Sequence, residues 1–424
     1  MLKTQISPVA FTRSSIFCAF ALLAAVSGRT AEDHLERARA ILARHPVVDG
    51  HNDLPWAIRE SASFPRDVVA YDLRRRTEGH TDLERLRQGG VGGQFWSVYV
   101  PYAPTAARTQ LEQIDIARRV VDRYPERLAF AASADDVERA MRAGRVASLF
   151  GMEGGHAIEN SLGALRAYYG LGVRYMTLTH SKTLDWADSA TDVARHGGLT
   201  RFGEEVVREM NRLGMLVDLS HVSPASMEDA LRVSEAPVIF SHSSARALCD
   251  HPRNVPDDVL RALQANGGVV MVTFVNAFIS PEFARASTPL WKQYDERASR
   301  LADPLARQAL WRELAARMPK IKVTLGQVAD HVEHVRKVAG VEAVGLGGDY
   351  DGNDAWPEGL EDVSGYPRLF AELLRRGWSE EDLARLANGN ILRVMRQAET
   401  VARRLQQARP ASTATIERLD APGQ

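Results

Sequence analysis

The chain has 424 residues, 45% of them hydrophobic, and a formal net charge of −1, which is the composition of an ordinary soluble globular protein. A charge so close to zero gives no attraction to nucleic acid or to an anionic membrane surface, so neither is expected as a partner. Cys18 lies in an N-terminal apolar run. If that run is removed, Cys249 has no internal disulfide partner, and stability must come from a hydrophobic core.

Residues 1–28 have the pattern of a secretory signal peptide. Lys3 and Arg13 precede an uncharged apolar run from Ile16 to Val26, and small residues follow it. The run is short for a membrane span. The pattern therefore predicts export to the periplasm or the medium, and the alternative is an uncleaved N-terminal anchor.

Eight short apolar segments rich in β-branched or aromatic residues are predicted as strands, and amphipathic helical stretches separate them. In chain order the strands are Val47–Gly50, Gly93–Val100, Val146–Phe150, Val173–Thr179, Met215–Ser220, Pro237–Ser241, Gly268–Phe274 and Ala343–Gly348. Helices with recognisable ends include Glu204–Leu213 before Gly214, Pro256–Ala265 before Asn266, and Leu325–Ala339 before Gly340.

This alternation predicts a (β/α)8 TIM barrel, with a doubly wound open sheet as the alternative. We expect one barrel domain over residues 29–408 and a polar tail over residues 409–424. The tail has no apolar stretch, so no lipid anchor is expected there. Two insertions, near residues 64–90 and 281–322, have the character of lids or oligomer contacts.

Side chains able to bind metal or transfer protons follow six of the eight predicted strands. They are His51 and Asp53, then Glu153, His180, His221, His242 and Asp349. Each alone has an ordinary alternative, as a buried histidine, a loop cap or a turn acid. Because a barrel enzyme carries its chemistry at the carboxyl ends of its strands, their joint placement predicts one site on that face.

Neutral imidazoles combined with carboxylates suit zinc better than calcium or magnesium. Five ligands are more than one tetrahedral zinc with an open position needs, so two ions sharing a carboxylate is the economical arrangement, with Glu153 as the candidate bridge. Two ions about 3.5 to 4 Å apart can hold a hydroxide and lower its pKa. Asp49, Asp218 and His156 are placed either to orient the ligands or to form ordinary buried salt links.

Seven segments carry a resemblance to a known family, in order between Ile41 and Arg396. They are Val48–Pro55, Gly151–His156, Leu178–Ser181 with Trp186–Asp188, Val217–His221, Phe240–Ala245, Arg253–Asp258 and Gly347–Gly352. Together they resemble the membrane (renal-type) dipeptidases, which are zinc dipeptidases within the amidohydrolase-like barrels.

The resemblance implies two zinc ions per subunit and a role for each site residue. His51 and Asp53 would hold one ion, His221 and His242 the other, and Glu153 would bridge them. His180 would stabilise the oxyanion formed at the scissile carbonyl, Arg253 would bind the free carboxylate of the substrate, and Asp349 would handle protons. A guanidinium pairs a carboxylate through two parallel hydrogen bonds, so Arg253 restricts the substrate to one residue after the scissile bond.

The chain departs from the animal enzymes of this family, which carry disulfides and a lipid anchor. Cys249 has no partner and no anchoring signal is found, so no stable membrane attachment is expected. Phe278 lies where a tyrosine is common, which leaves one substrate contact in doubt. The 281–322 insertion is longer than in the animal enzymes. The family suggests a homodimer.

We therefore predict an exported zinc dipeptidase that hydrolyses dipeptides with a free C-terminal carboxylate by a metal-bridging hydroxide. One alternative is a related binuclear amidohydrolase acting on another amide, an N-acyl amino acid or a lactone. The other is an exported metal-binding protein without catalysis. The presence of His180 and Asp349 argues against a metal-binding protein without catalysis, since neither residue is needed merely to hold zinc.

Overall fold

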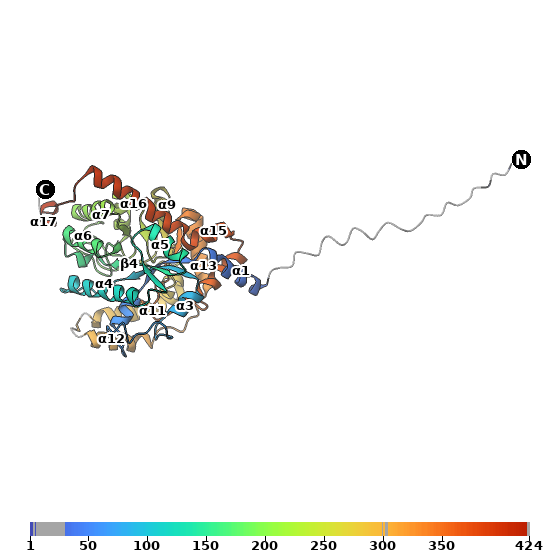
Figure 1. The fold of residues 1–424 in the computed structure, drawn as a ribbon, viewed down its shortest axis with the longest axis horizontal. Helices are drawn as coiled ribbons and strands as arrows, with labels where there is room; N and C mark the ends of the chain where they lie inside the picture. The colour runs from blue at the N-terminus through green and yellow to red at the C-terminus, as the bar shows by residue number, and fades with distance from the viewer. Residues whose placement is uncertain (3–4, 6–29, 299, 302–303, 422–424) are drawn as a thin grey trace.

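Nine parallel strands form the central sheet in this computed structural model, which describes residues 1–2, 5, 30–298, 300–301 and 304–421 (Figure 1). The predicted signal peptide at residues 1–28 lies outside the described residues except for 1–2 and 5. Within the described part of the chain, no helix is long and apolar enough to cross a membrane.

Eight of the nine strands close into a barrel, in the order β2-β1-β9-β8-β7-β6-β5-β4, and β2 pairs with β4 to complete the ring. The barrel strands are β1 (Val47–Asn52), β2 (Val91–Ser97), β4 (Val146–Glu153), β5 (Val173–Thr177), β6 (Leu216–Asp218), β7 (Ile239–Phe240), β8 (Val269–Val272) and β9 (Val344–Leu346). The predicted (β/α)8 barrel is confirmed, and the closing β2–β4 pair excludes the open sheet. A ninth strand, β3 (Leu128–Phe130), lies beside the start of β4 and was not predicted.

Helices surround the barrel (Figure 1). They are α1 (Ala31–Arg44), α2 (Leu54–Arg59), α3 (Leu83–Gln88), α4 (Ala106–Arg123), α5 (Ala134–Arg142), α6 (Leu162–Gly170), α7 (Arg201–Leu213), α8 (Pro224–Val233), α9 (Asp257–Asn266), α10 (Asn276–Ile279), α11 (Pro281–Ala298), α12 (Pro304–Ala315), α13 (Leu325–Ala339), α14 (Tyr366–Arg375), α15 (Glu380–Ala384), α16 (Asn390–Ala408) and α17 (Ile416–Leu419), with short helical turns η1 (Gly155–Ile158), η2 (Val341–Ala343), η3 (Val363–Gly365) and η4 (Arg385–Gly389). Gly214 ends α7 in the left-handed conformation, as the sequence predicted for a helix end.

Side chains alternate between the two faces of each barrel strand. Val47 and Val270 belong to the larger core, which lies between the strands and the helices. Their neighbours Val48 and Val269 belong to a second core, which fills the barrel. Both faces of every strand are thus buried, and the polar residues at the strand ends stand on a rigid support.

His331 on α13 is a buried neutral histidine that links the loop at Ala245 to the end of α10. The backbone N–H of Ala245 donates to its Nδ1 at 3.0 Å, and its Nε2 lies 3.1 Å from the carbonyl of Ile279. Burial lowers its pKa to about 4, because the charged form would be desolvated.

Because His331 is buried in its neutral form, we expect the free energy of unfolding to fall in acid. The unfolded chain binds a proton near pH 6.5 and the folded chain near pH 4, so stability is lost as the pH falls through that window. Urea unfolding of the wild type should lose about 2 kcal/mol between pH 7 and pH 5 through this residue. The loss should be absent from His331→Gln. An identical pH dependence in both proteins would contradict the assignment.

Candidate metal centre

The seven side chains predicted from the strand ends gather at the carboxyl face of the barrel. His51 lies in β1 and Asp53 just after it, Glu153 ends β4, His180 follows β5, His221 follows β6, His242 follows β7 and Asp349 follows β9. In a parallel barrel these positions share one rim, so topology alone brings them together.

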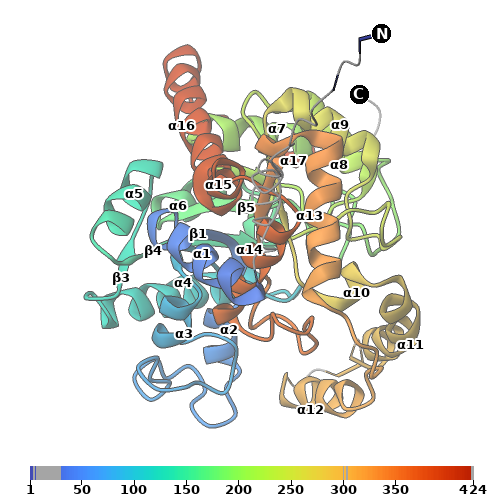
Figure 2. The same cartoon turned by 90° about the vertical axis from the view of Figure 1, so that its right-hand side faces the viewer.

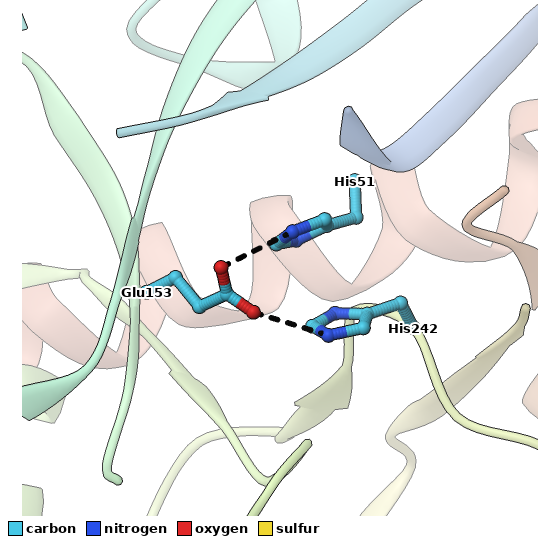
Figure 3. Close-up of side chains that lie close together, drawn as sticks. All are labelled: His51, Glu153 and His242. Carbon is cyan, nitrogen blue, oxygen red and sulfur yellow. Dashed lines mark ion pairs between the residues drawn. The ribbon is translucent and has the colours of Figure 1, made fainter. Parts of the chain in front are cut away.

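Glu153 lies at the centre of the cluster, and its two oxygens face different imidazoles (Figure 3). Its Oε2 lies 3.5 Å from His51 Nε2. Its Oε1 lies 3.0 Å from His221 Nε2 and 3.3 Å from His242 Nε2. This is the geometry of a carboxylate that can be shared between two cations.

The remaining groups extend the cluster on either side of Glu153. Asp53 Oδ2 lies 3.3 Å and Asp349 Oδ1 3.9 Å from His51 Nε2. On the other side, His180 Nε2 lies 3.8 Å from Glu153 Oε1. Three overlapping sets of side chains could each hold an ion: His51, Glu153 and His242; Glu153, His180 and His221; His51, Asp53 and Asp349.

The donor atoms fit a divalent metal ion. His221 Nε2 and His242 Nε2 lie 3.0 Å apart. Two nitrogens bound to one tetrahedral zinc would be about 3.3 Å apart, given Zn–N bonds of about 2.0 to 2.1 Å. Among the described residues, the buried atoms His51 Nε2 and Asp53 Oδ1 have no hydrogen-bond partner. Buried polar atoms without partners are costly, and a bound cation would satisfy both.

Charges in the cluster also favour a cation. Burial acts to raise the pKa of Glu153, but His51, His221 and His242 hold it well below its usual value. Burial, together with neighbouring positive charge, lowers the pKa of His221 and of His242 well below the ordinary value. An ionised carboxylate and neutral imidazoles are the forms that bind metal.

The pKa of His51 also indicates that the cluster favours a positive charge. Burial acts to lower its pKa, yet neighbouring anionic groups, Glu153 and Asp53 among them, raise it well above the usual value. The cluster of carboxylates thus attracts positive charge to the Nε2 edge of this ring. A metal ion there would take the place of that proton.

Asp349 and His221 adopt backbone conformations that are rare for residues with side chains. Their φ angles are 64° and 69°. Strain of this kind gathers at functional sites, where the surrounding structure holds it in place. Burial, together with Asp53 and Glu153 and against the opposing effect of His51, raises the pKa of Asp349 well above its ordinary value, so its carboxylate is poised to take up a proton.

Arg253 is buried beside the imidazoles. Its Nη2 donates to the carbonyl of His242 at 3.2 Å and its Nη1 to Ser243 Oγ at 3.4 Å, while Nε has no partner among the described residues. Burial lowers its pKa to about 10, which still leaves it charged at neutral pH. The guanidinium lies 5.2 Å from the ring centre of Phe278, so that side chain contributes a cation–π contact and no hydroxyl.

The three residues proposed as outer orienting groups have different surroundings. Asp49 accepts from the backbone N–H groups of His51 and Gly348, at 2.9 and 2.7 Å, and so joins β1 to the loop that carries Asp349. Asp218 accepts from the Ser241 hydroxyl at 2.6 Å. The His156 ring contacts Tyr102 at 5.6 Å, and its Nε2 has no partner among the described residues.

Two contacts of the candidate ligand histidines were not predicted. The Tyr175 hydroxyl lies 2.8 Å from His51 Nδ1, and Ser241 Oγ lies 2.8 Å from His242 Nδ1. Ser241 directly precedes the candidate ligand His242 in the sequence, which was a usable signal. Tyr175 lies within a predicted strand, where an aromatic residue indicates only a buried core.

Helices α11 and α12 occupy the predicted 281–322 insertion and lie side by side at the edge of the molecule, next to α10 (Figure 2). They share a small core of their own, made by Leu290, Leu310 and Leu314. The indole N–H of Trp311 on α12 donates to Asp354, in the loop after β9. The insertion is therefore tied to the loop that carries Asp349.

A closed parallel barrel with a buried cluster of imidazoles and carboxylates at its rim defines a barrel enzyme with a metal centre as the class of protein. The family model for membrane dipeptidases (peptidase family M19) matches residues 35–409. The chain therefore belongs to this family and is a metallodipeptidase.

Similar proteins agree with this assignment. The chain is 45% identical to "Dipeptidase 3" of Mus musculus over 375 residues, which are 86% of this chain and 67% of the mouse protein. The crystal structure of the probable dipeptidase PvdM from Pseudomonas aeruginosa has the same fold, with a TM-score of 0.75 and 23% identity over 88% of this chain and 100% of that one. A metallo peptidase from Rhodobacter sphaeroides, solved with a phosphinate mimic of the dipeptide L-Ala-D-Ala, has a TM-score of 0.68 and 25% identity over 83% of this chain and 99% of that one.

Proposed function

We propose that the protein is a zinc-dependent dipeptidase with two zinc ions per subunit. His51 and Asp53 would hold one ion, His221 and His242 would hold the other, and Glu153 would be shared between them. The observation that carries the proposal is the position of Glu153, whose Oε2 faces His51 and whose Oε1 faces the other two histidines. A donor set of imidazoles and carboxylates favours zinc over ions that prefer only oxygen ligands.

The bound ions would supply a water nucleophile of lowered pKa and polarise the scissile carbonyl. The protein's own residues do the rest. The His180 imidazole donates to the oxygen of the attacked carbonyl as negative charge develops there. Asp349 takes the proton of the attacking water and delivers it to the departing amine, which suits its raised pKa.

Arg253 selects the substrate. Its buried guanidinium keeps its charge, and among the described residues its Nε–H has no partner, so it can bind the free carboxylate at the end of a dipeptide. A dipeptide substrate is further supported by the family and by the dipeptide mimic bound to the Rhodobacter sphaeroides relative.

The test is a panel of L,L and L,D dipeptides assayed with metal analysis. Chelation should abolish hydrolysis and added zinc should restore it. Amidation of the C-terminal carboxylate should abolish turnover of an otherwise good dipeptide. Hydrolysis that survives metal removal, or equal turnover of the free and amidated forms, would contradict the proposal.

Arg253→Ala should raise KM for dipeptides about 30-fold or more, since removing one partner of a buried charge pair costs about 2 kcal/mol or more. The same substitution should not restore turnover of the amidated dipeptide, which serves as the internal control. Arg253→Lys keeps the positive charge but loses the paired N–H donors of the guanidinium. Its KM should lie between those of the wild type and Arg253→Ala. An unchanged KM in Arg253→Ala would remove the argument for a free carboxylate.

A second candidate is hydrolysis of N-acyl amino acids, which also end in a free carboxylate that Arg253 can bind. It differs only in lacking the free amino group of a dipeptide. Comparing one dipeptide with its N-acetyl derivative separates the two functions, because a dipeptidase should not hydrolyse the acetylated compound.

We also propose export and a homodimer. The charged and apolar pattern of residues 1–28 supports export to the periplasm or the medium. N-terminal sequencing of the mature protein should find its first residue near position 29. Light scattering should give the mass of a dimer, and a monomer mass would remove that part of the proposal.

A further inference from the structure

We propose that Tyr175 and the Ser241–Asp218 pair are positioning residues, which hold the rings of His51 and His242 with Nδ1 protonated and Nε2 directed at the metal. The inference rests on the proposed zinc centre and deepens it. It assigns a role to side chains that would touch neither the metal nor the substrate.

The hydroxyl of Tyr175 determines the orientation of the His51 ring. It lies 2.8 Å from His51 Nδ1 and 3.3 Å from the carbonyl oxygen of Gly50. A carbonyl oxygen only accepts, so the hydroxyl donates to Gly50 and accepts from Nδ1–H of His51. The partners therefore assign the tautomer, and they leave the Nε2 edge of His51 facing Glu153.

The barrel is built to let Tyr175 reach His51. Tyr175 lies on β5 and His51 on β1, and these strands are not neighbours in the barrel. Gly151 on β4 stands opposite Tyr175 in the strand register. A Cβ at position 151 would lie 2.0 Å from the Tyr175 ring, so only glycine leaves room for it.

Ser241 does the same for His242 through a different set of atoms. Its Oγ lies 2.8 Å from His242 Nδ1 and 2.6 Å from Asp218 Oδ2. Asp218 is fully buried on β6 and also accepts the backbone N–H of Ser241 at 2.8 Å. A carboxylate accepts, so the Ser241 hydroxyl donates to Asp218 and accepts from Nδ1–H of His242.

Both histidines are thus oriented through a hydroxyl group. Metal-binding histidines usually donate their second N–H to such a partner, which fixes the ring and strengthens it as a ligand. Removing the hydroxyl leaves a buried N–H without a partner and frees the ring to turn.

The test is the zinc affinity of the metal-free protein, measured by competition with a chromophoric chelator. Tyr175→Phe and Ser241→Ala should each bind zinc about 10- to 100-fold more weakly than the wild type. Tyr124→Phe is the matched control for Tyr175→Phe. Tyr124 is also a buried tyrosine, and its hydroxyl accepts from the N–H of Leu73 at 2.9 Å and from none of the candidate ligand histidines. Ser226→Ala is the control for Ser241→Ala, because Ser226 is buried and donates to the carbonyl of Asp188 at 3.0 Å.

Thermal unfolding of the metal-free proteins separates positioning from simple packing. If Tyr175→Phe unfolds at a lower temperature yet binds zinc as tightly as the wild type and Tyr124→Phe, the hydroxyl is structural and the inference is wrong. The same outcome for Ser241→Ala would overturn its half of the proposal. A wild-type protein that binds no zinc would instead overturn the proposed function, and the inference with it.

Discussion

Asp349→Asn should lower kcat by about 10²- to 10⁴-fold, the usual contribution of a positioned general base. The amide has nearly the same shape as the carboxylate but cannot take up a proton. Asp349 Oδ1 lies 3.9 Å from His51 Nε2 and is not one of the five proposed ligands, so zinc content should stay the same as in the wild type. The measurement is steady-state hydrolysis of a good dipeptide beside metal analysis of the same preparation.

The metal analysis decides how this result is interpreted. A fall in kcat with full zinc content places Asp349 in proton transfer. Loss of zinc in step with loss of activity would make Asp349 a ligand instead, and full turnover would remove it from the chemistry.

Glu153→Gln should have the largest effect of any single change in the cluster. The substitution removes the charge that balances the facing imidazoles and leaves an amide N–H₂ pointing at one of them. We expect fewer than two zinc ions per chain and a fall in kcat/KM of more than about 10³-fold, because nucleophile and carbonyl polarisation both depend on the ions.

The control for this variant is Glu159→Gln, the same exchange on an exposed side chain shortly after it in the chain. That protein should keep its zinc and its activity. Full zinc occupancy in Glu153→Gln would show that Glu153 does not bridge two ions.

The barrel could be predicted from sequence because most of its strands contain a short apolar run. Short β-branched runs such as the one around Val270 stand out between amphipathic helices. The strand β3 was missed because it has only three residues, two of them partly exposed, and lies outside the ring. The β7 strand is shorter than its predicted segment, since it contains only Ile239 and Phe240.

The placement of the candidate ligand side chains followed from the barrel, since residues after parallel strands must share one rim. The contacts behind them did not follow. Tyr175 meets His51 only because the chain is closed into a ring and Gly151 leaves a gap, and both depend on strand register. The hydrogen bond between Trp311 and Asp354 likewise depends on how α12 packs, which the sequence does not show.

Cys249 has a consequence for how this protein can be made. It is the only cysteine beyond the N-terminal apolar run, and its buried thiol donates to the carbonyl of Ala277 at 3.5 Å. Burial raises its pKa to about 11, so the thiol stays protonated and unreactive. Folding of residues 29–424 therefore involves no oxidation step. A version without the N-terminal run should fold equally well in the reducing cytoplasm of an expression host and in an oxidising compartment.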